Sequence, residues 1–225
     1  MVEITIQDKK YEIPTAWEDM TLEFWCKMYS VINKYVRRDE DGTILEDISE
    51  SEVEGAKLNR ELFMALTGLK SHEMKNLDAD SVNQSVYAFH TTLVEYKPKG
   101  IDRFIFEDEE YFFPKEFLKN NTFGDYIEST HLDETIKMMK HGRFDVLPEQ
   151  MAILCRKAGE EYDDDKIPEK TKKFTQLKMD LVWEFAFFLT QQSVRLTKIF
   201  RTFSEEQEQP LKKTAYLQKE SITSL

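Results

Sequence analysis

One short pattern occurs twice in the chain, at residues 4–14 and at residues 104–114. Each copy alternates apolar and polar residues, crosses a polar turn, and ends in a tyrosine, one intervening residue, an apolar residue and a proline. Period-two alternation around a polar turn predicts a short β-hairpin. The closing Pro14 or Pro114 cannot donate a backbone hydrogen bond, so it ends the second strand.

The two copies keep a constant spacing, because Tyr11 and Pro14 recur as Tyr111 and Pro114. Each copy is followed by a threonine and an amphipathic run, at Thr21 and at Thr122. The pattern therefore predicts an internal duplication, with one hairpin-plus-helices unit in residues 1–100 and another in residues 101–203. Chance is the alternative, because a hairpin followed by helices is a common arrangement. A polar tail, residues 204–225, follows the second unit.

Composition predicts an α+β fold that is mostly helical. The chain has 225 residues, of which 40% are hydrophobic, and only 7 glycines and 6 prolines, which argues against a loop-rich sandwich. Apolar residues at helical spacing predict helices near residues 21–38, 56–66, 80–94, 122–140, 148–159 and 168–203. Gly68 is expected to cap the second helix, and Pro148 and Pro168 to open the last two. Residues 39–54 are expected to form an acidic loop.

The formal net charge of −12 argues against nucleic acid or an anionic membrane as a partner. It favours a basic protein surface. The chain begins with a strand pattern, so we expect no signal peptide and a cytosolic location. The most apolar run, residues 181–189, is too short to span a bilayer and contains Glu184. Cys26 and Cys155 lie in apolar runs and are expected to be buried free thiols.

No phosphate-binding glycine motif or nucleophile elbow occurs in the sequence. We therefore expect no catalytic residues and no cofactor. His72-Glu73 begins like a zinc-protease motif, but Asn76 replaces its second histidine, so no metal site is predicted there. The acidic loops lack the calcium-loop register and are expected to be solvated.

Two alternatives of other classes remain open. A metal-dependent enzyme would need the run from Asp163 to Asp165 to meet a histidine in a cleft. A nucleic-acid-contacting accessory protein would use the basic segment from Arg195 to Arg201, together with Lys212 and Lys213. If calorimetry shows no binding of divalent metals, the enzyme alternative is excluded. If a labelled DNA duplex shows no mobility shift at low salt, the nucleic-acid alternative is excluded.

The aromatic residues near the end of the last predicted helix suggest a contact with another protein. Phe187 and Phe188 extend the apolar surface beyond one helix face. Ordering a polar tail costs about 1–2 kcal/mol of backbone entropy per residue, and the few apolar residues of the tail would not offset this cost on the surface of their own chain. We therefore expect the tail to dock on a neighbouring protein. The residues predicted to bind a partner are Phe187, Phe188, Phe200, Arg201, Phe203, Tyr216, Leu217 and Leu225.

Two stretches resemble a known family. The segment from Ile13 to Thr21, with Thr15-Ala16-Trp17-Glu18-Asp19-Met20-Thr21, resembles baseplate hub assembly and tail assembly chaperone-like proteins of tailed bacteriophages. The segment from Leu147 to Arg156 and the acidic loop with Tyr162-Asp163 are similar to that family as well.

The resemblance covers most of the chain up to about Phe203 and implies a non-enzymatic role in morphogenesis. The implied partners are other phage tail, baseplate or neck proteins, with self-association in a ring as a further possibility. The implied location is the host cytoplasm during assembly, or the virion. The tail after Ser204 departs from the family pattern, which leaves a permanent neck or portal–tail connector ring subunit as the alternative.

Overall fold

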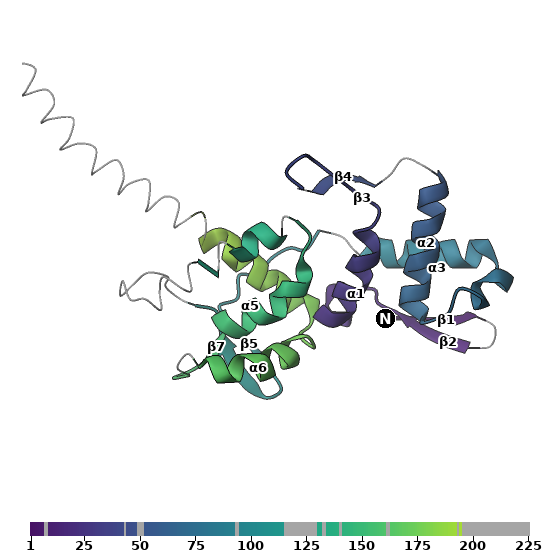
Figure 1. Ribbon diagram of the computed structural model, residues 1–225. Coiled ribbons are helices and arrows are strands. Elements are labelled where there is room, and N and C mark those ends of the chain that lie inside the picture. Colours follow the sequence, from purple (N-terminus) through teal and green to yellow (C-terminus); the bar gives the residue numbers. More distant parts are fainter. Residues whose placement is uncertain are drawn as a thin grey trace, which may run out of the picture.

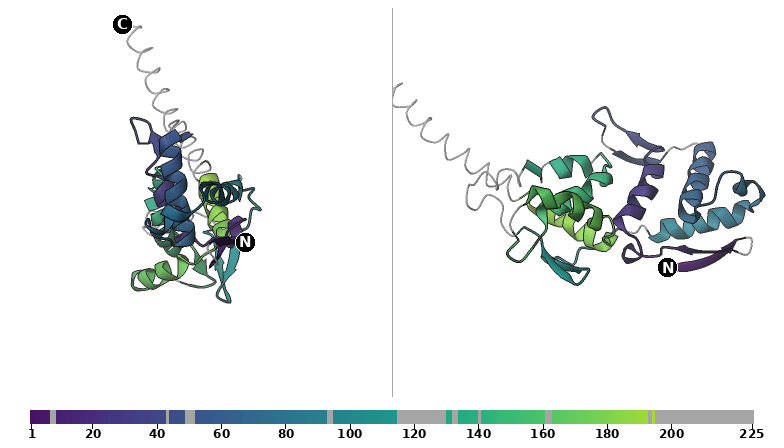
Figure 2. Two further views of the ribbon diagram at one scale, coloured as in Figure 1. Left: turned by 90° about the vertical axis from the view of Figure 1, so that its right-hand side faces the viewer. Right: turned by 60° about the horizontal axis from the view of Figure 1, so that its bottom comes forward.

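The computed structural model describes residues 1–6, 9–42, 44–48, 52–92, 95–114, 130–131, 134–139, 141–160, 163–192 and 194. It is a mixed, mostly helical α+β structure, as the composition predicts. Helices α2 and α3 lie at one end with the first hairpin, helices α5 and α6 lie at the other with the second, and α1 stands between them (Figures 1 and 2). No helix among the described residues combines the length and apolarity needed to cross a bilayer.

Both predicted hairpins are present and share one register. Strands β1 (Val2–Ile6) and β2 (Lys9–Ile13) pair so that Ile4 faces Tyr11, and β5 (Arg103–Phe106) and β6 (Glu109–Phe112) pair so that Phe104 faces Tyr111. The two tyrosines therefore occupy equivalent places. A short third strand, β7 (Arg156–Lys157), pairs with β6, and no other strand pairs with β7 among the described residues. Duplication remains a prediction, because most of the segment after the second hairpin lies outside the described residues.

The first half continues through a 3-10 turn, η1 (Trp17–Asp19), into α1 (Leu22–Ile32). The Thr21 hydroxyl caps α1 by accepting a hydrogen bond from the Phe24 amide. Helix α2 (Glu52–Thr67), the turn η2 (Glu73–Asn76) and α3 (Ala79–Thr92) follow. The predicted cap at Gly68 is confirmed, since its φ is +73° and its amide donates to the Met64 carbonyl.

The prediction that the first helix reaches Arg38 is wrong. Helix α1 ends at Ile32, and Val36–Arg38 form strand β3, which pairs with β4 (Ile44–Ile48). The predicted acidic loop therefore contains a strand. The β-branched Val36 favours extended backbone, and the polar turn at Asp39–Gly42 returns the chain as a hairpin. Sequence spacing alone does not separate these residues from a helix, since Tyr35 continues the helical period.

The second half contains helical residues 130–131 and 134–139, the turn η3 (Phe144–Val146) and α5 (Leu147–Leu154). Pro148 stands in the first turn of α5, as predicted. The expectation that this helix continues to Gly159 is wrong, because Arg156 and Lys157 form β7 against β6. The turn η4 (Asp164–Lys166) leads into α6 (Ile167–Phe174), which has Pro168 in its first turn.

The long helix predicted from residue 168 is interrupted. Helix α6 ends at Phe174, and helical structure resumes at residues 179–192. The break exists because the intervening backbone bonds to the first half of the chain. Leu22 donates its amide to the Leu177 carbonyl at 2.8 Å, and Thr21 forms a β-bridge with Lys178. Local periodicity cannot report such a partner from a distant segment.

The buried residues of both halves form one hydrophobic cluster. At its centre all three tryptophans meet, because the Trp17 ring lies 5.3 Å from both Trp25 and Trp183, edge to face in each case. Ile13 and Phe113, which occupy equivalent positions in the two hairpins, are both fully buried. Cys155 is a buried free thiol as predicted, whereas Cys26 is only half-buried.

Candidate functional site

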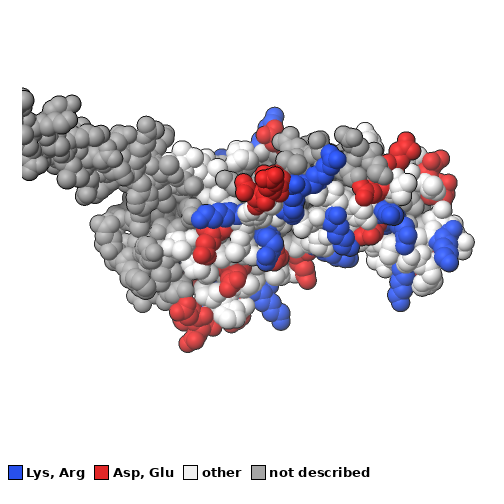
Figure 3. All heavy atoms as spheres, turned by 45° about the horizontal axis from the view of Figure 1, so that its top comes forward, with Lys and Arg blue, Asp and Glu red and all other residues white. Residues whose placement is uncertain are grey.

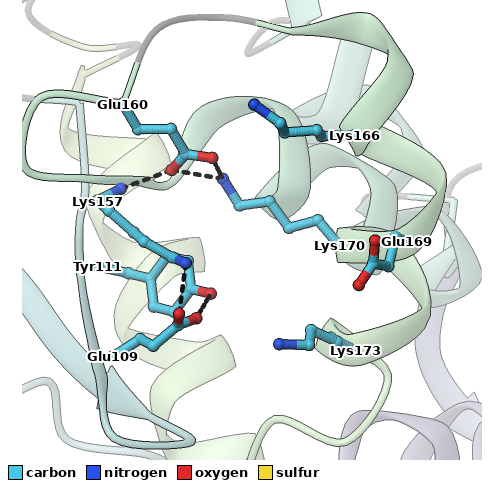
Figure 4. A pocket seen from close by; sticks show the side chains of 8 residues that line it. All are labelled: Glu109, Tyr111, Lys157, Glu160, Lys166, Glu169, Lys170 and Lys173. Carbon is cyan, nitrogen blue, oxygen red and sulfur yellow. Dashed lines mark hydrogen bonds and ion pairs between the residues drawn. The ribbon is translucent and has the colours of Figure 1, made fainter.

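A charged pocket lies between the second hairpin and α6 (Figure 4). It encloses about 120 Å³ and is lined by side chains from β6, β7, α6 and the turns before α6. The lining residues are Glu109, Tyr111, Lys157, Glu160, Lys166, Glu169, Lys170 and Lys173. Lys166, Lys170 and Lys173 follow the i, i+4, i+7 spacing of one helix face, so they project toward the same side. That spacing is the signal in the sequence from which the pocket could have been predicted.

Lys170 is the deepest charged group of the pocket, with 8% of its surface exposed. Its Nζ lies 3.2 Å from both carboxylate oxygens of Glu160 and sits 5.4 Å above the centre of the Tyr111 ring. Burial lowers the pKa of Lys170 against the opposing effect of Glu160. The pair holds α6 against the turn that follows β7.

Glu109 closes the other side of the pocket. It accepts hydrogen bonds from the Tyr111 hydroxyl at 2.8 Å and from Lys157 Nζ at 2.6 Å. The bond from Lys157, followed by that from Tyr111, lowers the pKa of Glu109. Burial, followed by the bond to Glu109, raises the pKa of Tyr111, so the phenol remains protonated at neutral pH.

Each lysine of the pocket is paired with a carboxylate of the same chain. Lys166 bonds to Asp163 at 2.9 Å and Lys173 to Glu107 at 3.0 Å, beside the two pairs described above. Lys170 and Lys173 extend from α6 toward the strand residues on the far side (Figure 4). The pocket is thus a set of matched charges that fastens β6, β7 and α6 to one another.

A second buried charge, Glu184, fastens the segment that joins the two halves. The Glu184 residue is 3% exposed. Its carboxylate accepts hydrogen bonds from the Tyr96 hydroxyl at 2.7 Å and from the amides of Lys99, Gly100 and Ile101 at 2.5, 2.9 and 3.3 Å. Burial opposes its ionised form, but these four donors lower its pKa overall. A lone acidic residue within an apolar run indicates a carboxylate that is buried with hydrogen-bond partners. In the sequence, Glu184 was considered only as a charge that argues against a membrane span.

Two of the residues predicted to bind a partner lie among the described residues. Phe187 is half-buried beside Tyr96, with ring centres 6.2 Å apart, and Phe188 is half-buried beside Phe113, at 5.3 Å. Both thus contact rings of their own chain. The other predicted partner-binding residues lie outside the described residues: Phe200, Arg201, Phe203, Tyr216, Leu217 and Leu225.

Acidic and basic side chains are interspersed on the face of the molecule seen in Figure 3. Within the described ranges, no three His, Cys, Asp or Glu side chains come together as a metal-ligand group would. Asp163, the first residue of the acidic run, pairs with Lys166 and accepts a hydrogen bond from the Asp165 amide. The run is therefore engaged in local capping of the turn before α6.

Comparison with known proteins gives no relative: no family model, no curated protein and no solved structure matches this chain.

Proposed function

We propose that this chain is a non-enzymatic morphogenesis protein of a tailed bacteriophage, which acts in tail or baseplate assembly through contacts with other proteins. The observation that carries the proposal is the position of the segment from Ile13 to Thr21, where the resemblance is most distinctive. Ile13 is fully buried, Trp17 lies between Trp25 and Trp183, and Thr21 bridges to Lys178. The residues that carry the resemblance therefore lie in the core and at the contact with the last part of the chain. Such residues fix the shape of the protein, and an assembly protein binds its partners through its shape.

The charge pairs among the described residues support the same proposal. The lysines of the charged pocket are matched by carboxylates within the chain, and Glu184 is satisfied by four donors. Such pairs hold segments together and confer rigidity on the scaffold. We place the protein in the host cytoplasm during assembly, with other tail, baseplate or neck proteins as its partners.

Crosslinking in cells infected with the source phage, followed by mass spectrometry, tests this function. We expect crosslinks to tail, baseplate or neck proteins. Crosslinks confined to metabolic enzymes or to DNA would overturn the proposal. Because the alternative is a permanent neck or connector ring subunit, mature particles are analysed in parallel. Stoichiometric presence in the particle supports the connector subunit, and absence supports a transient assembly factor.

The predicted docking of residues 204–225 has its own test. We expect a chain truncated after Phe203 to lose at least tenfold in affinity for the complex captured by the full chain, about 1.4 kcal/mol. A matched Ile105→Glu variant of the full chain controls for general surface effects, since Ile105 is exposed and far along the sequence from the tail. Unchanged affinity of the truncated chain would show that the tail is not a docking arm.

A further inference from the structure

Lys170 brings a buried amine to the wall of the charged pocket. Its Nζ lies 5.4 Å from the centre of the Tyr111 ring and 5.8 Å from the centre of the Phe174 ring. These rings keep water from part of the ammonium, whereas the same side chain borders a pocket of about 120 Å³. A small molecule that enters the pocket therefore meets this amine.

The hydrogen bonds of Lys170 orient its amine. Nζ donates to both carboxylate oxygens of Glu160, at 3.2 Å each, and Figure 4 shows the side chain reaching from α6 to that carboxylate. Because the donated hydrogens point toward one carboxylate, the lone pair of the uncharged amine points away from Glu160. Glu160 thus positions the nitrogen without occupying the electron pair that a reaction needs.

The surroundings of Lys170 favour the uncharged amine more than those of other lysines in the chain. Burial lowers the pKa of Lys170, and Arg156 acts in the same direction, while Glu160 and Cys155 oppose them. By contrast, carboxylate partners raise the pKa of Lys166 and of Lys173. A desolvated lysine with a lowered pKa is the form in which this residue acts as a nucleophile.

We propose that Lys170 is a covalent modification site, whose amine condenses with a small aldehyde that carries an anionic group. The nitrogen bonds to the carbonyl carbon, the carbon–oxygen bond breaks, and the oxygen leaves as water with two hydrogens of the ammonium. No oxidant or reductant is needed. The iminium product keeps the third hydrogen and the positive charge, so Glu160 stabilises it as it stabilises the ammonium. This inference goes beyond the assembly role and does not depend on it.

The lining of the pocket selects the anionic group. It includes four lysines and three glutamates, in a chain whose net charge is −12. The carboxylates that pair with Lys166 and Lys173 belong to Asp163 and Glu107, which do not line the pocket. An ammonium has three N–H donors, so one ion pair leaves each of these lysines able to bind a further anion.

The volume of the pocket limits the size of the aldehyde. A water molecule takes up about 30 Å³ of liquid water, so the pocket has room for only a few water molecules. Glyoxylate, the smallest aldehyde that carries a carboxylate, is therefore the probe of choice.

Reductive trapping of the full chain tests the site. The protein is treated with glyoxylate and cyanoborohydride at neutral pH, so that hydride converts the iminium to a stable secondary amine, and the modified lysines are mapped by peptide mass spectrometry. Lys172, exposed on the same helix, is the internal control. We expect the initial rate at Lys170 to be at least about fivefold that at Lys172. A rate at Lys170 equal to or below that at Lys172 would overturn the proposal.

The pH dependence of the same reaction separates a reactive amine from a purely structural ion pair. We expect trapping at Lys170 to reach half its maximal rate at a lower pH than trapping at Lys172. Glu160→Gln should move this midpoint lower still, because the ammonium loses its counter-charge. A wild-type midpoint at or above that of Lys172, or a midpoint that Glu160→Gln leaves unchanged, would overturn the proposed site.

Acetaldehyde, which lacks the carboxylate, tests the class of ligand. Its rates at Lys170 and Lys172 are compared with those of glyoxylate, so that the different intrinsic reactivities of the two aldehydes cancel. We expect the preference for glyoxylate to be at least about threefold greater at Lys170 than at Lys172. Lys173→Gln, a change at a partly exposed position, should reduce that preference. Equal preferences at the two lysines of the wild type would overturn the requirement for an anionic group.

Discussion

The two hairpins share a register but differ in their surroundings. In the first, Tyr11 is half-exposed and both strand edges lack a neighbouring strand among the described residues. In the second, Tyr111 is 2% exposed, stacks on Phe104, packs against Phe174 and lies beneath the Nζ of Lys170. Within the part of the chain that the structure describes, strand β7 pairs with the second hairpin and not with the first. The comparison shows that strand pairing is decided within each pattern, whereas burial depends on what packs against it.

The largest expected difference between the hairpins concerns the equivalent tyrosines. Tyr111→Ala should cost about 3–5 kcal/mol of unfolding free energy, because it leaves a cavity beneath Lys170 and removes the hydrogen bond that the Tyr111 hydroxyl donates to the Glu109 carboxylate. Tyr11→Ala, the matched control, should cost about 1 kcal/mol, as for a side chain left partly in water. Urea unfolding measures both changes. Equal costs would mean that the two hairpins share the same environment after all.

The next largest loss of stability is expected at Glu184, which binds the segment before the second hairpin. Glu184→Gln should cost about 2–3 kcal/mol, since a charged acceptor of four hydrogen bonds is replaced by a neutral amide that also donates. Glu169→Gln, at an exposed position on α6, should change the unfolding free energy by less than about 0.5 kcal/mol. Chemical denaturation at neutral pH compares the two variants.

The lowered pKa of Glu184 makes the stability that it contributes depend on pH. The pKa of Glu184 is lowered in the folded chain from an ordinary value of 4.5. Its contribution to stability is therefore fully present above pH 4.5 and is lost as the pH falls through the lower, folded pKa. We expect the difference in melting temperature between the wild type and Glu184→Gln to shrink below pH 4.5. A difference that stays constant down to acid unfolding would contradict a bound carboxylate.

The ion pair between Lys170 and Glu160, above the Tyr111 ring, should contribute less to the unfolding free energy than Glu184 does. Lys170→Met keeps apolar contact with the Tyr111 ring but leaves the partly buried Glu160 without its ammonium partner, at a cost of about 1–2 kcal/mol. The double variant Lys170→Met, Glu160→Gln should recover part of that loss because the unpaired charge is gone. A double-mutant cycle measures the coupling. Additive losses would show that the pair is not coupled.

The smallest effect lies in the turn of the second hairpin. Glu107 and Asp108 have φ values of +50° and +61°, the left-handed region that a two-residue hairpin turn requires. Asp108→Gly should stabilise the chain by up to about 1 kcal/mol, since glycine adopts this conformation without a steric cost. Glu107 is left unchanged because it pairs with Lys173. A measured loss of stability would show that the Asp108 side chain itself supports the turn.

Short-range rules predicted much of the fold. The hairpin registers, the cap at Gly68 and the first-turn prolines of α5 and α6 follow from dihedral limits and missing donors of single residues. Such features depend on neighbours within a few positions. The matched spacing of Tyr11 and Tyr111 belongs to this group as well.

The candidate site was only partly visible in the sequence. The lysine spacing along α6 was available, but the partners Glu109 and Glu160 come from other elements, and no spacing links them to α6. The role of Glu184 required the linker at residues 99–101 to fold against it. Charge pairs between distant segments depend on tertiary geometry, and a chain with 43 acidic residues offers too many candidate pairs for sequence to select.

By itself, the sequence determined the two hairpins, most of the helices in the described residues and the apolar positions of their core. Only the tertiary structure decided that Val36–Arg38 form a strand, that the last helix breaks at residues 175–178 and that Tyr111 is buried while Tyr11 is not. In the first two cases a distant or returning backbone supplies hydrogen bonds that compete with those of a continuing helix. In the third, α6 and β7 cover one of two locally equivalent hairpins, because burial is a property of packing partners rather than of the strand that they cover.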